Sequence, residues 1–157
     1  GRILRRVADM VLTRDRSRVP FNLVVTGEAE TWLPALHQIV GTEYLVPRPV
    51  SDDRELLDIV GSGEADAAVL DDATQWRLDA LQLLRMIRRV NRTLPVVVVT
   101  GRRDRHWLED ALRLTAFSVV TRPLELEELL RQIARMMCRM DEMLRRGEGP
   151  QGTQGTQ

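Results

Sequence analysis

The chain has 157 residues with 23 basic and 23 acidic side chains, so it carries no formal net charge. This length suits one domain with a hydrophobic core of its own. A single cysteine, Cys138, excludes a disulfide framework and a thiolate-rich zinc site. Every basic residue is an arginine, which excludes chemistry by a lysine amine within this chain. No apolar run approaches the roughly 20 residues that span a bilayer, so we expect a cytoplasmic protein without a membrane partner.

Short apolar segments from residue 21 onward predict five β-strands. They lie at residues 21–25, 43–46, 66–71, 95–100 and 117–120. Several are continuously apolar, most clearly the four valines from Val96 to Val99. A strand that is apolar on both faces is typical of a parallel sheet with helices on each side.

Segments with a 3.6-residue apolar period alternate with these strands and predict five helices. They lie at residues 32–40, 53–60, 80–90, 105–115 and from Pro123 onward. Asp52 and Asp104 are suitable N-caps, and Pro123 is tolerated in a first helical turn. Five strand-then-helix units with short loops imply right-handed crossovers. We therefore expect an α/β fold with a doubly wound, five-stranded parallel sheet and helices on both of its faces.

Two flanking regions do not belong to this pattern. Residues 1–20 predict a short amphipathic helix followed by an arginine-rich linker, and the last helix is expected to run to about Arg146, so that residues 139–148 extend it beyond a domain of residues 21–138. Residues 149–157 have low complexity and are predicted to be disordered. The last helix carries apolar residues at heptad spacing, which indicates either a homodimer seam or packing on the N-terminal extension. The predicted seam comprises Ile133, Met137, Met140 and Leu144.

Polar residues follow four of the predicted strands, where the carboxyl ends of parallel strands gather functional groups. They are Thr26-Gly27-Glu28, Asp71-Asp72, Thr100-Gly101 and Arg122-Pro123. Together with the stretches "DAAVLDD", "LPVVVVTG" and "TRPLELEELL", this set resembles the receiver domain of bacterial two-component response regulators. The resemblance covers about residues 21–138 and implies a flavodoxin-like sheet with the strand order 2-1-3-4-5.

The resemblance also implies roles for individual residues. Asp71 matches the family's phosphoacceptor aspartate, Thr100 its phosphate-binding hydroxyl residue, and Arg122 its phosphate-binding lysine. A carboxylate attacks phosphorus only where a metal ion and cations neutralise the surrounding negative oxygens. The family holds Mg²⁺ with two acidic residues that follow the first strand.

This sequence departs from the family at those metal-binding positions. They are Thr26 and Gly27, which offer no carboxylate, and only Glu28 lies nearby. Arginine is a larger, planar cation and no simple replacement for lysine, so Arg122 is expected to pair directly with Asp71. We therefore predict a degenerate receiver without a metal or other cofactor.

Asp72 is an alternative acceptor because it would restore the family's usual spacing to Asp79. It would, however, shift the strand match by one residue and point to the other face of the sheet, so Asp71 is preferred.

The function predicted from these residues is a non-enzymatic pseudo-receiver that binds a signalling protein or an output domain, with a homodimer expected through the last helix. The main alternative is a working phosphoacceptor, phosphorylated on Asp71, in a response regulator or hybrid kinase. In that reading Asp72 or Glu28 supplies the metal carboxylate for Mg²⁺ and Arg122 the cation. A flavin- or nucleotide-binding domain lacks a phosphate loop here. Nucleic-acid binding would depend on the N-terminal arginines and is not expected of the main domain.

Three other side chains are further candidates for a functional role. His37 and His106 have no metal-ligand spacing and are expected at the surface or at helix ends. Trp76, beside the predicted site, fits either an exposed anchor for a partner or a cap on the core.

Overall fold

The computed structural model describes residues 20–27, 32–40, 45–72 and 76–145 of the chain. The predicted N-terminal helix, the predicted tail and Glu28 lie outside these residues. Among the described helices, none combines the length and the apolar character required to cross a membrane.

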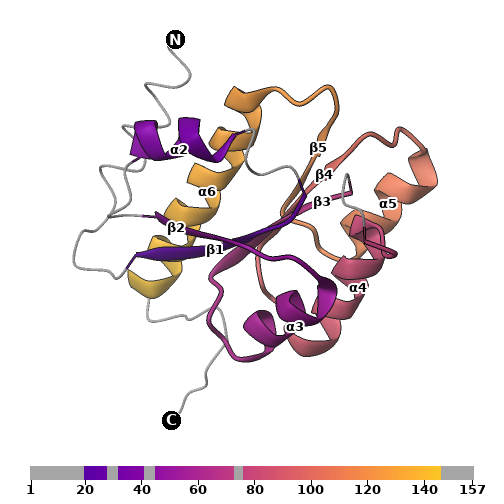
Figure 1. Cartoon of the computed structure of the whole chain (residues 1–157), viewed down its shortest axis with the longest axis horizontal. Coiled ribbons are helices and arrows are strands. Elements are labelled where there is room, and N and C mark those ends of the chain that lie inside the picture. The colour runs from indigo at the N-terminus through magenta and orange to yellow at the C-terminus, as the bar shows by residue number, and fades with distance from the viewer. Residues whose placement is uncertain (1–19, 28–31, 41–44, 73–75, 146–157) are drawn as a thin grey trace.

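The strands of the described part form one parallel sheet in the order β2-β1-β3-β4-β5 (Figure 1), which confirms the predicted order 2-1-3-4-5. The strands are β1 (Phe21–Val25), β2 (Leu45–Pro49), β3 (Ala67–Asp71), β4 (Val96–Thr100) and β5 (Ser118–Thr121). The strands β1, β3 and β4, whose side chains are nearly all buried, lie in the middle of the sheet. The strands β2 and β5 have fewer buried side chains and form its two edges.

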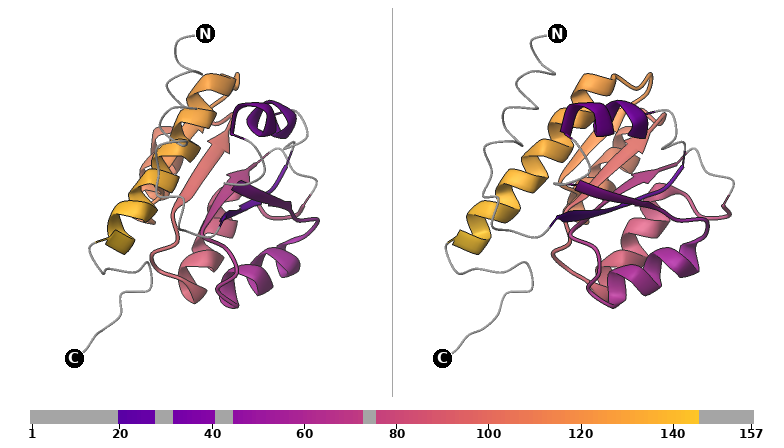
Figure 2. Two further views of the ribbon diagram at one scale, coloured as in Figure 1. Left: turned by 90° about the vertical axis from the view of Figure 1, so that its left-hand side faces the viewer. Right: turned by 60° about the vertical axis from the view of Figure 1, so that its left-hand side comes forward.

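Helices cover both faces of this sheet, as expected (Figures 1 and 2). The helices α2 (Leu33–Val40) and α6 (Leu126–Arg145) pack on one face. The helices α3 (Asp53–Gly61), α4 (Ala80–Val90) and α5 (Arg105–Arg113) pack on the other. Asp52, Asp79 and Asp104 cap the N-termini of α3, α4 and α5. Their carboxylates accept hydrogen bonds from backbone N–H groups at the start of each helix.

The alternation of side chains along β4 explains its four consecutive valines. Val97 and Val99 belong to the core between the sheet and α2 and α6, whereas Val96 and Val98 belong to the core beneath α3, α4 and α5. Successive side chains of a strand point to opposite faces, so a strand between two helical layers needs an apolar residue at every position.

The second strand and the last helix differ most from their predicted boundaries. The second strand continues beyond its predicted end at residue 46 through Pro47 to Pro49, because an edge strand tolerates prolines that a central strand does not. Residues 43–44 of the predicted strand lie outside the described residues. The last helix begins at Leu126 and not at Pro123. Pro123 follows a cis peptide bond with Arg122 and belongs to the turn before the helix.

The predicted dimer seam requires a correction. Ile133, Met137 and Met140 are 1%, 0% and 6% exposed and belong to the core cluster beneath α2 and α6. Apolar side chains that are already buried within one chain cannot form the exposed contact face of a dimer. Leu144 lies within α6, but its side chain is outside the described part of the structure.

Candidate functional site

The carboxyl ends of β1, β3, β4 and β5 bring the predicted site residues together at one edge of the sheet. The register pairs Asp71 with Val99, and Val99 with Val120. Since alternate residues of a strand share a face, Asp71, Val99 and Val120 point to the α2 and α6 side. Arg122 comes two residues after Val120 and continues on that side. The parallel register therefore places the Arg122 side chain next to that of Asp71.

Asp71 forms an ion pair with Arg122, as predicted from the sequence. The guanidinium Nη2 of Arg122 donates a hydrogen bond to Oδ1 of Asp71. The Asp71 side chain is 3% exposed and that of Arg122 is 27% exposed. Removal of one partner of such a pair leaves an uncompensated charge in a poorly solvated place. The site is thus a carboxylate whose charge is balanced by a cation of the same chain.

Thr26 contacts the backbone of the same aspartate. Its hydroxyl oxygen accepts a hydrogen bond from the backbone N–H of Asp71 at 2.8 Å, and its own N–H donates to the carbonyl of Val69 at 3.1 Å. Thr26 is only 2% exposed. The hydroxyl therefore ties the end of β1 to the end of β3.

Gly27 makes room for the Asp71 side chain. Its φ is +74°, a backbone conformation that L-residues with a Cβ rarely adopt. A Cβ at this position would lie 2.5 Å from Cβ and 2.9 Å from Oδ2 of Asp71. An acidic side chain therefore does not fit at Gly27 while the backbone keeps this path. Compared with the family, this position lacks both the negative charge of an acid and the space to hold one.

Thr100 contacts Asp72 and not Asp71, with which the resemblance had grouped it. Its hydroxyl donates a hydrogen bond to Oδ2 of Asp72 and accepts one from the backbone N–H of Arg102 at 3.0 Å. The register explains this partner. Asp71 lies opposite Val99, so the residues that follow them, Asp72 and Thr100, also lie next to each other.

Sequence reasoning missed the contribution of the loop after β4. The guanidinium of Arg102 lies 3.6 Å from Asp79 and 3.9 Å from Asp104, and it lies over the Trp107 ring at 5.5 Å from its centroid. Arg103 donates a hydrogen bond to the carbonyl of Arg122 at 3.0 Å. The stretch "GRRDRHW" signalled only positive charge, yet these arginines tie the loop to the turn after β5 and to the N-termini of α4 and α5.

The described residues do not supply a fitting donor set for Mg²⁺. This ion requires oxygen ligands in near-octahedral geometry. Gly27 has no side chain, the Thr26 hydroxyl is bonded to backbone, and one Asp71 oxygen is bonded to Arg122. Within the described ranges, no group of three or more His, Cys, Asp or Glu residues could hold a metal ion. Glu28 lies outside these ranges.

The remaining candidates are distributed over both faces of the sheet. His37 is on α2 and His106 on α5, and these helices pack on opposite faces of the sheet, so the two histidines cannot share a metal ion. Trp76 is half-buried against the core beneath α3, α4 and α5, which favours its interpretation as a cap on the core. Cys138 is half-buried on α6.

Comparison with known proteins places this site in a wider context. The family model described as "Response regulator receiver domain" matches residues 24–134. A response regulator MprA of Mycolicibacterium vanbaalenii is 37% identical over 128 residues, which are 82% of this chain and 52% of that protein. The chain thus spans about half the length of this curated relative.

Solved structures agree on the fold. The receiver domain of the TMAO respiratory system response regulator TorR superposes with a TM-score of 0.63 at 26% identity, covering 78% of this chain and all of that one. The signal receiver domain of a putative Luxo repressor protein from Vibrio parahaemolyticus has a TM-score of 0.68 at 14% identity, covering 83% and 99%.

Proposed function

Because the chain belongs to the family of response regulator receiver domains, we propose that it is an atypical member that acts in bacterial signal transduction by protein–protein interaction, in the cytoplasm and without enzymatic activity. In this proposal aspartyl phosphorylation is impaired or absent. The observation that supports it most is the ion pair between Arg122 and the buried Asp71, formed against Gly27 where the family has an acid.

The ion pair opposes phosphorylation for two physical reasons. A carboxylate oxygen that attacks phosphorus must give up its bond to the guanidinium, and separating a buried pair is costly. The incoming phosphoryl group also needs a metal ion to bridge and neutralise its oxygens, and the described corner formed by Thr26 and Gly27 offers no anionic ligand. The proposed role therefore uses the scaffold and not the chemistry of the family.

The proposed partner is a signalling protein or an output domain, because the match covers only 52% of a longer response regulator. A homodimer stays a prediction, and it cannot use the buried residues of α6. Light scattering at high protein concentration would measure the stoichiometry directly, and a monomer at all concentrations would contradict the dimer.

The alternative function is a working phosphoacceptor at Asp71. It is favoured by the position of Asp71 at the end of β3 and by a second carboxylate, Asp72, directly after it. In this reading Asp72 or Glu28 would contribute to Mg²⁺ binding, and Arg122 would release Asp71 to contact the phosphoryl oxygens.

One experiment separates the two functions. The purified chain is treated with acetyl phosphate and MgCl₂ and its intact mass is measured, beside a receiver with the complete set of acidic residues and lysine as a positive control. The proposal predicts no phosphoryl adduct on this chain while the control is labelled. Stoichiometric addition of one phosphoryl group that is abolished by Asp71→Asn, but not by the control Asp58→Asn on the exposed side of α3, would establish the alternative.

The variant Arg122→Lys sharpens this test. A lysine can pair with Asp71 but is a compact point charge on a flexible stem, so it blocks the carboxylate less rigidly. If the arginine is the main obstacle, Arg122→Lys gains an adduct that the wild type lacks. If the metal corner is the main obstacle, both proteins stay unlabelled.

A further inference from the structure

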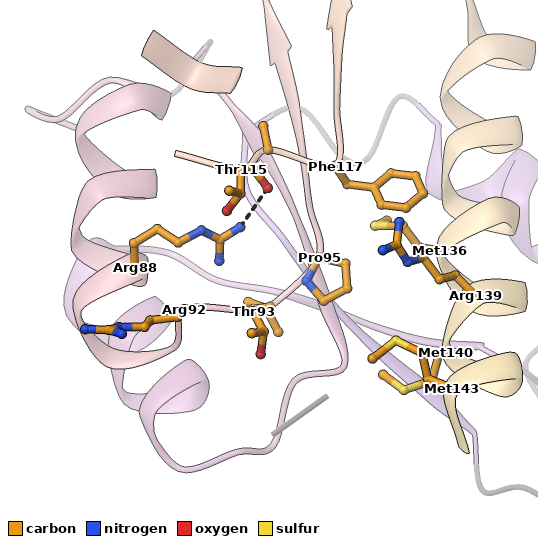
Figure 3. A pocket seen from close by; sticks show the side chains of 12 residues that line it. Arg88, Arg92, Thr93, Pro95, Thr115, Phe117, Met136, Arg139, Met140 and Met143 are labelled. Carbon is orange, nitrogen blue, oxygen red and sulfur yellow. Dashed lines mark hydrogen bonds between the residues drawn. The ribbon is translucent and has the colours of Figure 1, made fainter. Parts of the chain in front are cut away.

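A cavity lies at the end of the sheet opposite to Asp71. It is bounded by the start of β4 and β5, the C-terminal end of α4 and the second half of α6 (Figure 3). Its volume is about 480 Å³, within the range of pockets that hold small organic ligands. Nothing in the receiver chemistry discussed above uses this cavity.

The lining is largely apolar. Its apolar members are Leu94, Pro95, Ala116, Phe117, Met136, Met140 and Met143. Figure 3 shows the Phe117 ring and the methionine thioethers of α6 facing the same space from two sides. Methionine side chains are unbranched and polarisable, so they adapt to the shape of an apolar guest. The cavity therefore provides a deformable apolar wall.

Its charged members are all cations. Arg88, Arg92 and Arg139 line the cavity, and no acidic residue is among the described residues of its lining. An apolar cavity bordered by cations without anions favours a negatively charged guest, because the guest's charge is the missing counterpart.

Arg88 is a structural member of this set. Its guanidinium donates to the carbonyls of Leu114 at 2.7 Å, Asn91 at 3.2 Å and Thr115 at 3.2 Å, and the last contact is visible in Figure 3. Burial lowers the pKa of Arg88 because it disfavours the charged form. These three bonds fix the loop before β5 to the end of α4 and so hold the cavity open.

Arg139 is the cation that remains available. It is exposed on α6 and has no hydrogen-bond or ion-pair partner among the described residues. In Figure 3 its side chain extends from α6 toward the region below the Phe117 ring. Arg92 is also exposed and without such a partner in the described part, but it extends away from the cavity in that view.

We propose that this cavity binds a small amphipathic anion, an organic carboxylate whose apolar body packs against Phe117 and the α6 methionines while its carboxylate pairs with Arg139. The proposal stands apart from the proposed function, because its residues lie at the other end of the sheet and none of them contacts Asp71 or Arg122 in the contacts described above. An unmodified Asp71 is compatible with it, and so is a phosphorylated one.

The test uses the full chain, with 2-naphthoate and its uncharged analogue 2-naphthamide as probes. Binding is followed by NMR of ¹³C-methyl methionine, since Met136, Met140 and Met143 line the cavity and Met86 on α4 does not. We expect 2-naphthoate to shift the three cavity methyl signals, to leave that of Met86 in place, and to bind at least fivefold more tightly than 2-naphthamide.

Arg139→Gln supplies the decisive variant, with Arg131→Gln as the matched control on the same helix. Both arginines are exposed, so both variants are expected to fold, which the thermal unfolding midpoint verifies. Arg139→Gln should weaken 2-naphthoate about fivefold, the scale of one exposed ion pair, and leave 2-naphthamide unchanged. Arg131→Gln should change neither.

Three results would overturn the proposal. They are no shift of the cavity methyl signals at millimolar 2-naphthoate, equal affinity for the acid and the amide, and unchanged 2-naphthoate affinity in Arg139→Gln. The first would remove the cavity as a ligand site, and the other two would remove its preference for an anion.

Discussion

The arginines at the two ends of the sheet differ in whether they pair with carboxylates of the chain. At the carboxyl end, Arg122 pairs with the buried Asp71, and Arg102 lies between the carboxylates of Asp79 and Asp104. At the amino end, Arg139 stands beside an apolar cavity whose lining has no acid. At the first end the described arginines pair with carboxylates of the same chain, and at the second Arg139 has no such partner among the described residues.

This difference separates the two proposals, because each rests on side chains at a different end of the sheet. The carboxyl end of the sheet has the family's layout, but Arg122 contacts Asp71 there. Gly27, at a position where the family has a metal-binding acid, has no side chain to offer. The cavity at the amino end depends on the second half of α6, which contributes Met136, Arg139, Met140 and Met143 to its lining. The comparison predicts a large energetic response to mutation at the first end and a small one at the second.

The largest effect is expected for Arg122→Ala. It leaves the Asp71 carboxylate buried without the guanidinium, and breaking a buried pair in this way costs about 3 kcal/mol of unfolding free energy. Urea unfolding followed by circular dichroism measures the change. The double variant Asp71→Asn with Arg122→Ala removes the charge as well and should recover more than half of the loss. Equal stability of the single and double variants would show that the ion pair does not govern this end.

Gly27→Ala should come next, with a loss of about 2 kcal/mol. The added methyl group meets Cβ of Asp71 at 2.5 Å, and the positive φ is strained for any residue with a Cβ. The matched control is Gly61→Ala at the end of α3, where an added Cβ has open space around it. Thermal unfolding of both variants should separate them clearly, and equal midpoints would contradict the tight fit at Gly27.

A smaller loss, about 1 kcal/mol, is expected for Thr26→Val. Valine has a similar shape but cannot accept the hydrogen bond from the backbone N–H of Asp71, and an unmade buried hydrogen bond costs roughly this amount. Hydrogen exchange at the Asp71 amide offers a local reading of the same event. The amide should exchange faster in Thr26→Val than in Thr26→Ser, which keeps the hydroxyl.

The smallest effect is expected at the amino end. Arg139→Gln removes an exposed cation with no described partner, so the unfolding free energy should change by less than about 0.5 kcal/mol. A loss similar to that of Arg122→Ala would mean that Arg139 is part of the folded framework, and the contrast between the two ends would disappear.

The strands were predictable because a parallel sheet between two helical layers requires continuously apolar segments, whereas their order was implied by the resemblance to receiver domains. The four consecutive valines from Val96 to Val99 are the clearest example of such a segment. The pairing of Arg122 with Asp71 was also predictable, since the strand ends meet at one edge and the two charges are opposite. The partner of Thr100 was not, because it depends on the register of β3 against β4, which an apolar run of uniform composition does not specify.

Backbone shape and helix burial were the other features beyond reach. The positive φ of Gly27 is a property of the loop, and a glycine in the sequence does not reveal which conformation it adopts. The heptad spacing of α6 suggested a dimer seam, yet Met137 and Met140 are buried in the chain's own core. An apolar stripe indicates that one face of a helix is buried, but it does not indicate which part of the structure buries it.

The outer strand β2 carries a consequence for association between chains. The Val50 N–H donates inward to Val25 of β1, and because N–H directions alternate along a strand, positions 47 and 49 face outward. Both are prolines and have no hydrogen to donate. A foreign extended segment that approached this rim would find two donors missing from its ladder, so the fold is protected there against strand recruitment and fibril growth.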